Sequence, residues 1–214
     1  METKKDYIEA IEGAERRFLA SEIEVRANDN GEMNTIDFTP IVFNSTADLG
    51  WFEERIEPGA FDGLIETQDV RALKNHDPNY VLARSNKGQG TLLMKIDDSG
   101  VHCSFEPRDR SYMNDLKDEI KSGDISQGSF AFSVEEQEWR DSQKYGEKGL
   151  RVIKKIRGWY DVSIVTYPAY PDTTVARSLF DATKKKYTPT EGTKTKWPAS
   201  LRKAQLIINQ NKVK

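Results

Sequence analysis

Apolar residues alternate with polar residues, or form short runs, in several stretches of the chain that are separated by Gly, Asn, Ser and Asp. Such alternation puts every second side chain on one face and is typical of strands buried on one side. The pattern predicts strands at residues 18–25, 36–43, 69–74, 80–84, 91–96, 100–105, 125–139, 150–156 and 159–166. Many short strands at close spacing predict an antiparallel sheet or barrel.

One clear helix interrupts the strands. Its apolar residues recur at four-residue spacing: Tyr112, Leu116 and Ile120. Asp109 or Ser111 can cap its start, and Gly123 can end it. Further helical segments are predicted within residues 1–15, 60–66 and 199–208. The expected fold class is therefore mainly β with helices (α+β).

Length and composition favour one folded domain with extensions. A chain of 214 residues can bury one substantial core, and 36% hydrophobic with 31% charged residues fits a soluble protein. We divide it into an N-terminal helical extension (1–15), a central domain (16–181) and a tail (182–214). The sequence contains no long apolar run and no apolar signal core at its start, so neither a membrane span nor export by a signal peptide is expected. The single cysteine, Cys103, excludes an internal disulfide framework and suits a reducing cytoplasm.

Charge is distributed unevenly along the chain. Residues 182–214 contain nine Lys or Arg residues and one Glu, a net charge of +8, whereas the whole chain carries −3. The preceding residues therefore carry −11. A basic tail on an acidic body predicts that the tail has its own partner or is removable, and a solvated end is the alternative.

His76 is the more informative of the two histidines, because it closes a predicted strand. Two later segments could complete a catalytic set with it: residues 126–132, which contain serines, and residues 160–165, which contain Asp161. A serine is a poor nucleophile until an imidazole accepts its proton and a third group fixes the ring. The chain order of His, Ser and Asp proves nothing, since such triads occur in several orders. The alternative is that His76 ends a strand and binds a loop carbonyl.

The identity of the serine is less certain from the residues alone, because four serines lie close together: Ser122, Ser126, Ser129 and Ser133. Ser129 follows Gly128, whose missing side chain lets a substrate backbone approach, and it ranks slightly above Ser126. Asp161 begins an apolar strand, where an unpaired carboxylate is costly to bury, so a partner is expected; a solvent-facing carboxylate is the alternative. Two histidines and one cysteine are too few for a thiolate and imidazole metal site. No cofactor is predicted.

Several segments, taken in order, resemble the prohead proteases of tailed bacteriophages. The resemblance lies in residues 42–45, 54–61, 75–78, 123–130 and 161–170, and it spans about residues 16–178. It implies a serine endopeptidase that matures the viral procapsid. It also implies a fold similar to that of herpesvirus assembly proteases, an antiparallel β-barrel surrounded by helices.

The resemblance also implies roles for individual residues. By position, His76 matches the catalytic histidine of the family, Ser129 its nucleophile and Asp161 its acidic third member. In the herpesvirus relatives the third member is a histidine, which leaves His102 as an alternative. Asp161 is the better orienting residue, because a carboxylate stabilises the imidazolium formed during attack more than a neutral histidine does.

Substrates, partners and location follow from the same resemblance. It implies cleavage of scaffold, of the scaffolding region of the major capsid protein and of the protease itself, inside the assembling procapsid in the host cytoplasm. A homodimer is expected by analogy with the herpesvirus enzymes. Nucleic acid is not an expected partner, because the Lys-rich tail lacks interleaved aromatic residues. The alternative function is a catalytically inactive factor that binds capsid protein or scaffold during assembly.

Overall fold

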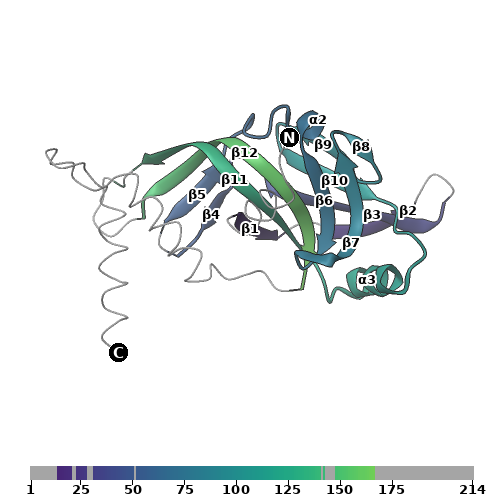
Figure 1. Ribbon diagram of the computed structural model, residues 1–214. Coiled ribbons are helices and arrows are strands. Elements are labelled where there is room, and N and C mark those ends of the chain that lie inside the picture. Colours follow the sequence, from purple (N-terminus) through teal and green to yellow (C-terminus); the bar gives the residue numbers. More distant parts are fainter. Residues whose placement is uncertain are drawn as a thin grey trace, which may run out of the picture.

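The computed structural model describes residues 14–20, 23–27, 31–50, 52–140, 142 and 148–166. In this part of the chain β-strands predominate and form two sheets (Figure 1). The larger sheet contains β1 (Glu15–Ala20), β4 (Thr46–Asp48), β5 (Glu53–Ile56), β6 (Asp69–Lys74), β7 (Asp77–Asn86), β8 (Gln89–Gly90), β11 (Gln127–Arg140) and β12 (Leu150–Val165). The smaller sheet contains β2 (Ile23–Ala27), β3 (Met33–Val42), β9 (Leu93–Asp97) and β10 (Gly100–Phe105). The helices are α2 (Leu64–Thr67) and α3 (Ser111–Ser122).

The larger sheet is built around β11 and β12, which pair antiparallel and arch across the molecule (Figure 1). Its strands follow the order β1-β11-β12-β6-β7-β8, and β4 and β5 branch from the path. β5 pairs parallel with the first residues of β12, and β6 pairs parallel with its last residues. Several irregularities interrupt the register between β11 and β12, and such bulges bend a strand pair. β12 therefore lies between β11 on one side and β6 on the other.

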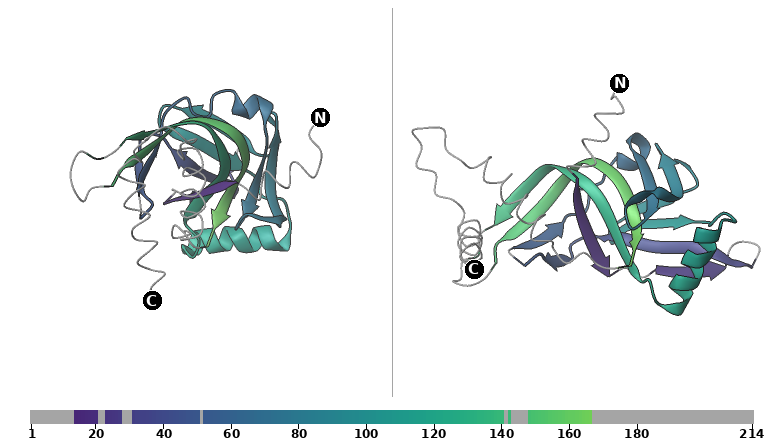
Figure 2. Two further views of the ribbon diagram at one scale, coloured as in Figure 1. Left: turned by 60° about the vertical axis from the view of Figure 1, so that its left-hand side comes forward. Right: turned by 60° about the horizontal axis from the view of Figure 1, so that its bottom comes forward.

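The smaller sheet is antiparallel throughout, in the order β2-β3-β10-β9, and it shares one hydrophobic core with the larger sheet. Phe105 enters the core from β10, and Phe130 and Trp159 enter it from β11 and β12. Phe61 packs edge to face against Trp159, with ring centroids 5.2 Å apart. Helix α3 lies at one end of the strands (Figure 2). It contributes three buried side chains: Met113, Leu116 and Ile120.

The predicted mainly β class is confirmed, but the sheets do not close into a barrel. In the described residues, β1 and β8 are the end strands of the larger sheet's main order and do not pair with each other. β2 and β9 are likewise the end strands of the smaller sheet. The expectation of antiparallel pairing throughout is wrong, because β5 and β6 run parallel to β12. The detailed likeness to herpesvirus assembly proteases stays a prediction.

Most predicted strands are present, with some changes of bounds. β6 and β10 have the predicted bounds, whereas the predicted strand at residues 18–25 is two strands, β1 and β2, in different sheets. The two strands predicted between residues 150 and 166 form one continuous strand, β12. Gly158 in its middle lets the Tyr160 hydroxyl approach closely, since a Cβ there would lie 2.6 Å from that oxygen.

Helix α3 begins and ends near the predicted residues. Gly123 ends it in the left-handed conformation, with a φ of 82°, as glycine at this position commonly does. The N-cap prediction is wrong: the N-cap is Arg110, and it makes no side-chain capping bond. Residues 1–13 and 167–214 lie outside the described residues, so the predicted N-terminal and tail helices and the three-part division stay predictions.

A group of four charged side chains, three buried and one (Glu15) partly buried, ties β1 to β5 and β12. Arg17 on β1 donates hydrogen bonds of 2.5 and 2.8 Å to Glu54 on β5, and Arg151 on β12 donates to Glu54 at 2.8 Å. Both arginines also donate to Glu15, at 2.6 to 2.9 Å. Burial by itself raises the pKa of Glu15, but the hydrogen bond and charge of Arg151, followed by those of Arg17, lower it overall. β1 is thus tied to β5 and β12 by charges that neutralise one another.

We expect Glu54→Gln to lower the free energy of unfolding by about 3 kcal/mol or more, because it leaves Arg17 and Arg151 buried with a single carboxylate between them. Equilibrium unfolding in urea measures this loss. The matched control is Glu135→Gln, which removes an exposed ion pair of 2.9 Å and should cost less than about 1 kcal/mol. Equal losses in the two variants would contradict a structural role for this charged group.

Candidate active site

Three neighbouring strands of the larger sheet position the candidate residues. Ser129 lies on β11, Asp161 lies on β12, and His76 lies in the turn between β6 and β7. Across the β11–β12 pair, Ser129 is opposite Ser163 and Ala131 is opposite Asp161. β6 runs parallel along the same stretch of β12. Because alternate residues of a strand face the same side, this register gathers side chains from all three segments.

The turn between β6 and β7 presents the imidazole. Asn75 and His76 have φ values of 55° and 56°, a left-handed conformation in which Asn and His are enriched among non-glycine residues. The Asn75 backbone N–H donates to the Ile164 carbonyl at 2.9 Å. The Asn75 side chain donates to the Thr166 hydroxyl at 3.2 Å and accepts from the Thr166 N–H at 2.9 Å. These three bonds attach the turn to the end of β12.

The side chains of Ser129, His76 and Asp161 form a continuous hydrogen-bonded series. Ser129 Oγ lies 2.5 Å from His76 Nε2, and His76 Nδ1 lies 2.6 Å from Asp161 Oδ1. An ionised carboxylate only accepts hydrogen bonds, so Nδ1–H donates to Asp161 and the Nε2 lone pair accepts from the Ser129 hydroxyl. This imidazole tautomer is the one that can take a proton from serine.

The series is shielded from water. Ser129 is fully buried, and the side chains of His76 and Asp161 are 9% and 7% exposed. Asp161 Oδ1 accepts a second hydrogen bond, from the Ser163 hydroxyl at 2.8 Å. Two donors compensate the cost of burying this carboxylate. The partner predicted for Asp161 is therefore present, and the alternative of a solvent-facing carboxylate is wrong.

The geometry suits serine-dependent hydrolysis, and comparison with known proteins gives the family. Residues 21–187 match the sequence profile described as caudovirus prohead serine protease. The chain belongs to this family. Membership makes it a serine protease of capsid maturation, which confirms the predicted enzyme class.

Other comparisons add little to the family match. Among solved structures, the bacteriophage T4 capsid assembly protease is similar with a TM-score of 0.39 and 13% identity. That similarity covers 72% of this chain and 99% of the T4 chain. No curated protein gave a significant match.

Two other candidates for this prohead protease do not join the series. His102 lies on β10 in the smaller sheet. Its ring lies 3.1 Å from each of three side chains: Thr39, Ser99 and Asp97. Ser126 is exposed and precedes β11. The structure therefore brings Asp161 to His76, and it places His102 elsewhere. Cys103 is buried, and burial raises the pKa of its thiol, which disfavours the reactive thiolate.

Three residues around the Ser129–His76–Asp161 series were not named as candidates from the sequence: Asn75, Ser163 and Thr166. Ser163 follows Asp161 by two positions in a strand, so alternation alone could have placed both on one face. Asn75 tolerates the left-handed conformation better than most residues, which is a weak signal. Thr166 lies in a segment of the family resemblance, but its residue type gives no sign of its contact with Asn75, because that contact depends on the pairing of β6 with β12.

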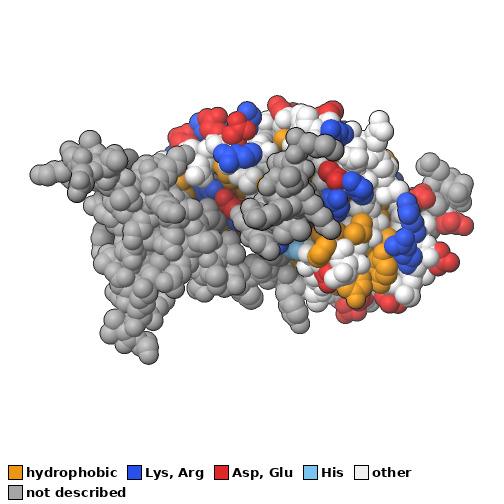
Figure 3. Space-filling view, in the orientation of Figure 1, with side chains coloured by type: hydrophobic (Ala, Val, Ile, Leu, Met, Phe, Trp, Pro, Cys, Tyr) orange, Lys and Arg blue, Asp and Glu red, His pale blue; other side chains and the backbone are white. Residues whose placement is uncertain are grey.

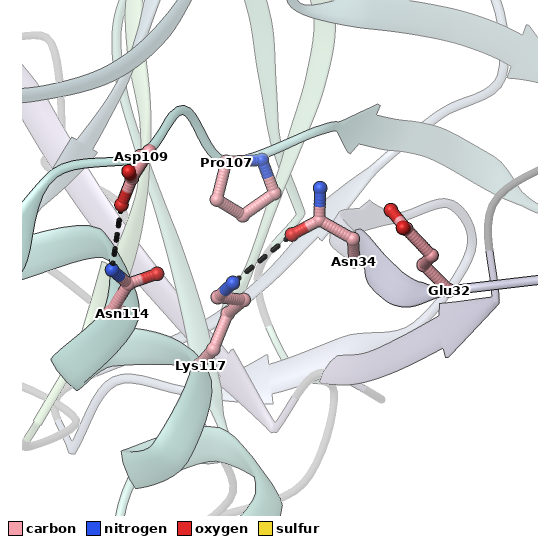
Figure 4. A pocket seen from close by; sticks show the side chains of 6 residues that line it. All are labelled: Glu32, Asn34, Pro107, Asp109, Asn114 and Lys117. Atoms are coloured by element: carbon pink, nitrogen blue, oxygen red, sulfur yellow. Dashed lines mark hydrogen bonds between the residues drawn. The ribbon is translucent and has the colours of Figure 1, made fainter.

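Two cavities of about 350 Å³ each lie beside α3. One adjoins the His76 turn and is lined in part by Tyr80 and Tyr112, on a face where hydrophobic side chains gather over β7 and α3 (Figure 3). The other is polar, and in it Lys117 donates to Asn34 at 3.0 Å (Figure 4).

Within the described ranges, no group of three His, Cys, Asp or Glu side chains is placed to hold a metal ion. In the same ranges no helix is both long and apolar enough to cross a membrane.

Proposed function

We propose that Ser129 is the nucleophile, His76 the general base and Asp161 the orienting carboxylate in the hydrolysis of peptide bonds by this prohead protease. The observation that carries the proposal is the unbroken contact from Ser129 Oγ through the imidazole to Asp161, with distances of 2.5 and 2.6 Å. Family membership supports the reaction class, and the hydrogen-bond geometry supports the role of each residue.

The proposed reaction follows from the order of these contacts. As Ser129 Oγ attacks the substrate carbonyl carbon, its proton passes to His76 Nε2 and a C–O bond forms. His76 then gives that proton to the departing amine as the C–N bond breaks, which leaves an acyl-enzyme ester. A water molecule then attacks the ester carbon as its proton passes to His76 Nε2. The C–O bond to Ser129 breaks, and His76 returns the proton to Ser129 Oγ. Asp161 stabilises the imidazolium at both stages because its carboxylate accepts from Nδ1–H.

The proposed substrates are scaffold, the scaffolding region of the major capsid protein and the protease itself. The proposed site of action is the assembling procapsid in the host cytoplasm. Membership of the prohead family supports capsid and scaffold proteins as partners. The homodimer stays a prediction, as does the role of the basic tail, which lies outside the described residues. We expect the tail to bind an acidic scaffold surface or to be clipped.

Co-expression with the capsid and scaffold proteins of the same virus tests these substrates. We expect new peptide termini, located by mass spectrometry, that appear with the wild-type chain and not with Ser129→Ala. Identical capsid, scaffold and protease termini in both samples would contradict the proposal. If assembly nevertheless required the chain, that result would favour the catalytically inactive assembly factor.

A further inference from the structure

Ser163 is a buried serine to which the mechanism above gives no role. It is fully buried and lies opposite Ser129 in the β11–β12 pair, and its hydroxyl contacts both Asp161 and His76. We propose that Ser163 is a positioning residue, which links the Asp161 carboxylate to the backbone of the His76 turn and so fixes the orientation of the imidazole. The inference rests on the proposed roles of the triad.

The hydrogen-bonding capacity of the Ser163 hydroxyl is directed at these two residues. A hydroxyl has one proton to donate and two lone pairs that accept. Its proton goes to Asp161 Oδ1 at 2.8 Å, and it accepts the backbone N–H of His76 at 3.3 Å. Ser163 Oγ also lies 3.2 Å from His76 Nδ1, but Nδ1 lies closer to Asp161 Oδ1, at 2.6 Å. The carboxylate is therefore the main acceptor of Nδ1–H, and Ser163 donates to the same carboxylate oxygen, Oδ1.

The link matters because the turn that carries His76 is conformationally unfavourable. Asn75 and His76 are successive non-glycine residues with left-handed φ values, and such a backbone persists only where surrounding contacts hold it. The bonds from Asn75 to Thr166 hold the first residue of the turn. The bond from the His76 N–H to Ser163 holds the second. Without the Ser163 hydroxyl, the backbone N–H of His76 loses its acceptor, and the Asp161 carboxylate loses one of its two hydrogen-bond donors.

Ser133 is the matched control for Ser163, because its hydroxyl makes a hydrogen bond that does not involve Ser129, His76 or Asp161. It lies on β11 in the same strand pair, and its hydroxyl is 3.0 Å from the Tyr160 hydroxyl. Loss of the Ser133 hydroxyl removes a hydrogen bond from the same part of the sheet without touching the triad. An effect specific to Ser163 is therefore separable from a general loss of packing.

Steady-state kinetics on a cleaved peptide give the first test. For Ser163→Ala we expect kcat to fall by about 10- to 100-fold, the scale of the cost when a buried polar group loses its hydrogen-bond partner, while KM changes little. Ser133→Ala should keep the wild-type kcat. Ser163→Thr retains the hydroxyl and should recover most of the activity that Ser163→Ala loses. A wild-type kcat in Ser163→Ala would overturn the inference.

Nuclear magnetic resonance gives a second test that needs no catalytic activity. The chain has two histidines, so ¹⁵N-histidine labelling reports on His76 and provides His102 as an internal reference. We expect Ser163→Ala to shift the Nδ1–H signal of His76 and to leave that of His102 in place, whereas Ser133→Ala should leave both. An unchanged His76 signal in Ser163→Ala would overturn the positioning role even if Ser129 is the nucleophile. Unimpaired cleavage by Ser129→Ala would instead overturn the proposed triad.

Discussion

Ser129→Ala should lower the rate of cleavage by roughly a millionfold, the scale on which loss of the nucleophile acts in a serine protease. The reason is chemical, because the variant lacks the oxygen that lies 2.5 Å from His76 Nε2 and would form the acyl-enzyme. The chain should still fold, since the substitution removes one oxygen from a fully buried side chain. Cleavage of purified capsid protein over time measures the rate, and circular dichroism checks the fold.

The matched control for this prediction is Ser126→Ala. Ser126 lies three positions before Ser129, is exposed, and is the serine that the sequence alone left nearly as plausible. We expect Ser126→Ala to cleave at the wild-type rate. An inactive Ser126→Ala together with an active Ser129→Ala would show that Ser126, and not Ser129, is the nucleophile.

Asp161→Asn should lower kcat by about 10⁴-fold with little change in KM, as expected when a triad carboxylate becomes an amide. An amide lacks the charge that stabilises the imidazolium, and its NH₂ group can donate to Nδ1, which places the imidazole proton on Nε2. That tautomer cannot accept the proton of Ser129. Steady-state kinetics separate this loss of kcat from a loss of substrate binding.

Asp97→Asn is the control for Asp161→Asn. In the described residues, Asp97 contacts His102 as Asp161 contacts His76. Its Oδ1 lies 3.1 Å from His102 Nε2. We expect Asp97→Asn to retain the wild-type kcat. A large loss in Asp97→Asn, together with normal activity in Asp161→Asn, would restore His102 as the third member of the triad.

Local patterns in the sequence predict much of this fold. Alternation over residues 100–105 predicts β10 with the observed bounds. A short apolar run within residues 69–74 predicts β6 with the observed bounds. Four-residue spacing and Gly123 predict α3 and its end. Local patterns fail where long-range pairing decides. The break between β1 and β2, and the parallel pairing of β5 and β6 with β12, depend on partners far away in the chain.

Buried charges illustrate the same limit. Arg17 and Arg151 are nearly inaccessible to solvent, although arginine is ordinarily a surface residue. Only the pairing of β1, β5 and β12 brings Glu15 and Glu54 to them, so a linear sequence gives no reason to bury either arginine.

The candidate site was predictable to a greater extent than the pairing of the strands. His76, Ser129 and Asp161 were all candidates from their residue types and from a family resemblance, and the structure brings them together. The residues alone could not decide between Ser129 and Ser126, since that choice depends on which serine lies beside the β6–β7 turn. Ser163 joins the site only through the register of β11 with β12 and the position of the same turn.

The most direct test of the proposed triad is to find which serine is chemically activated. A fluorophosphonate reacts with activated serine hydroxyls, and peptide mass spectrometry then locates the modified residue. We predict an adduct on Ser129 that forms much more slowly in Asp161→Asn. An adduct on Ser126 or Ser163, with Ser129 unmodified, would contradict the triad.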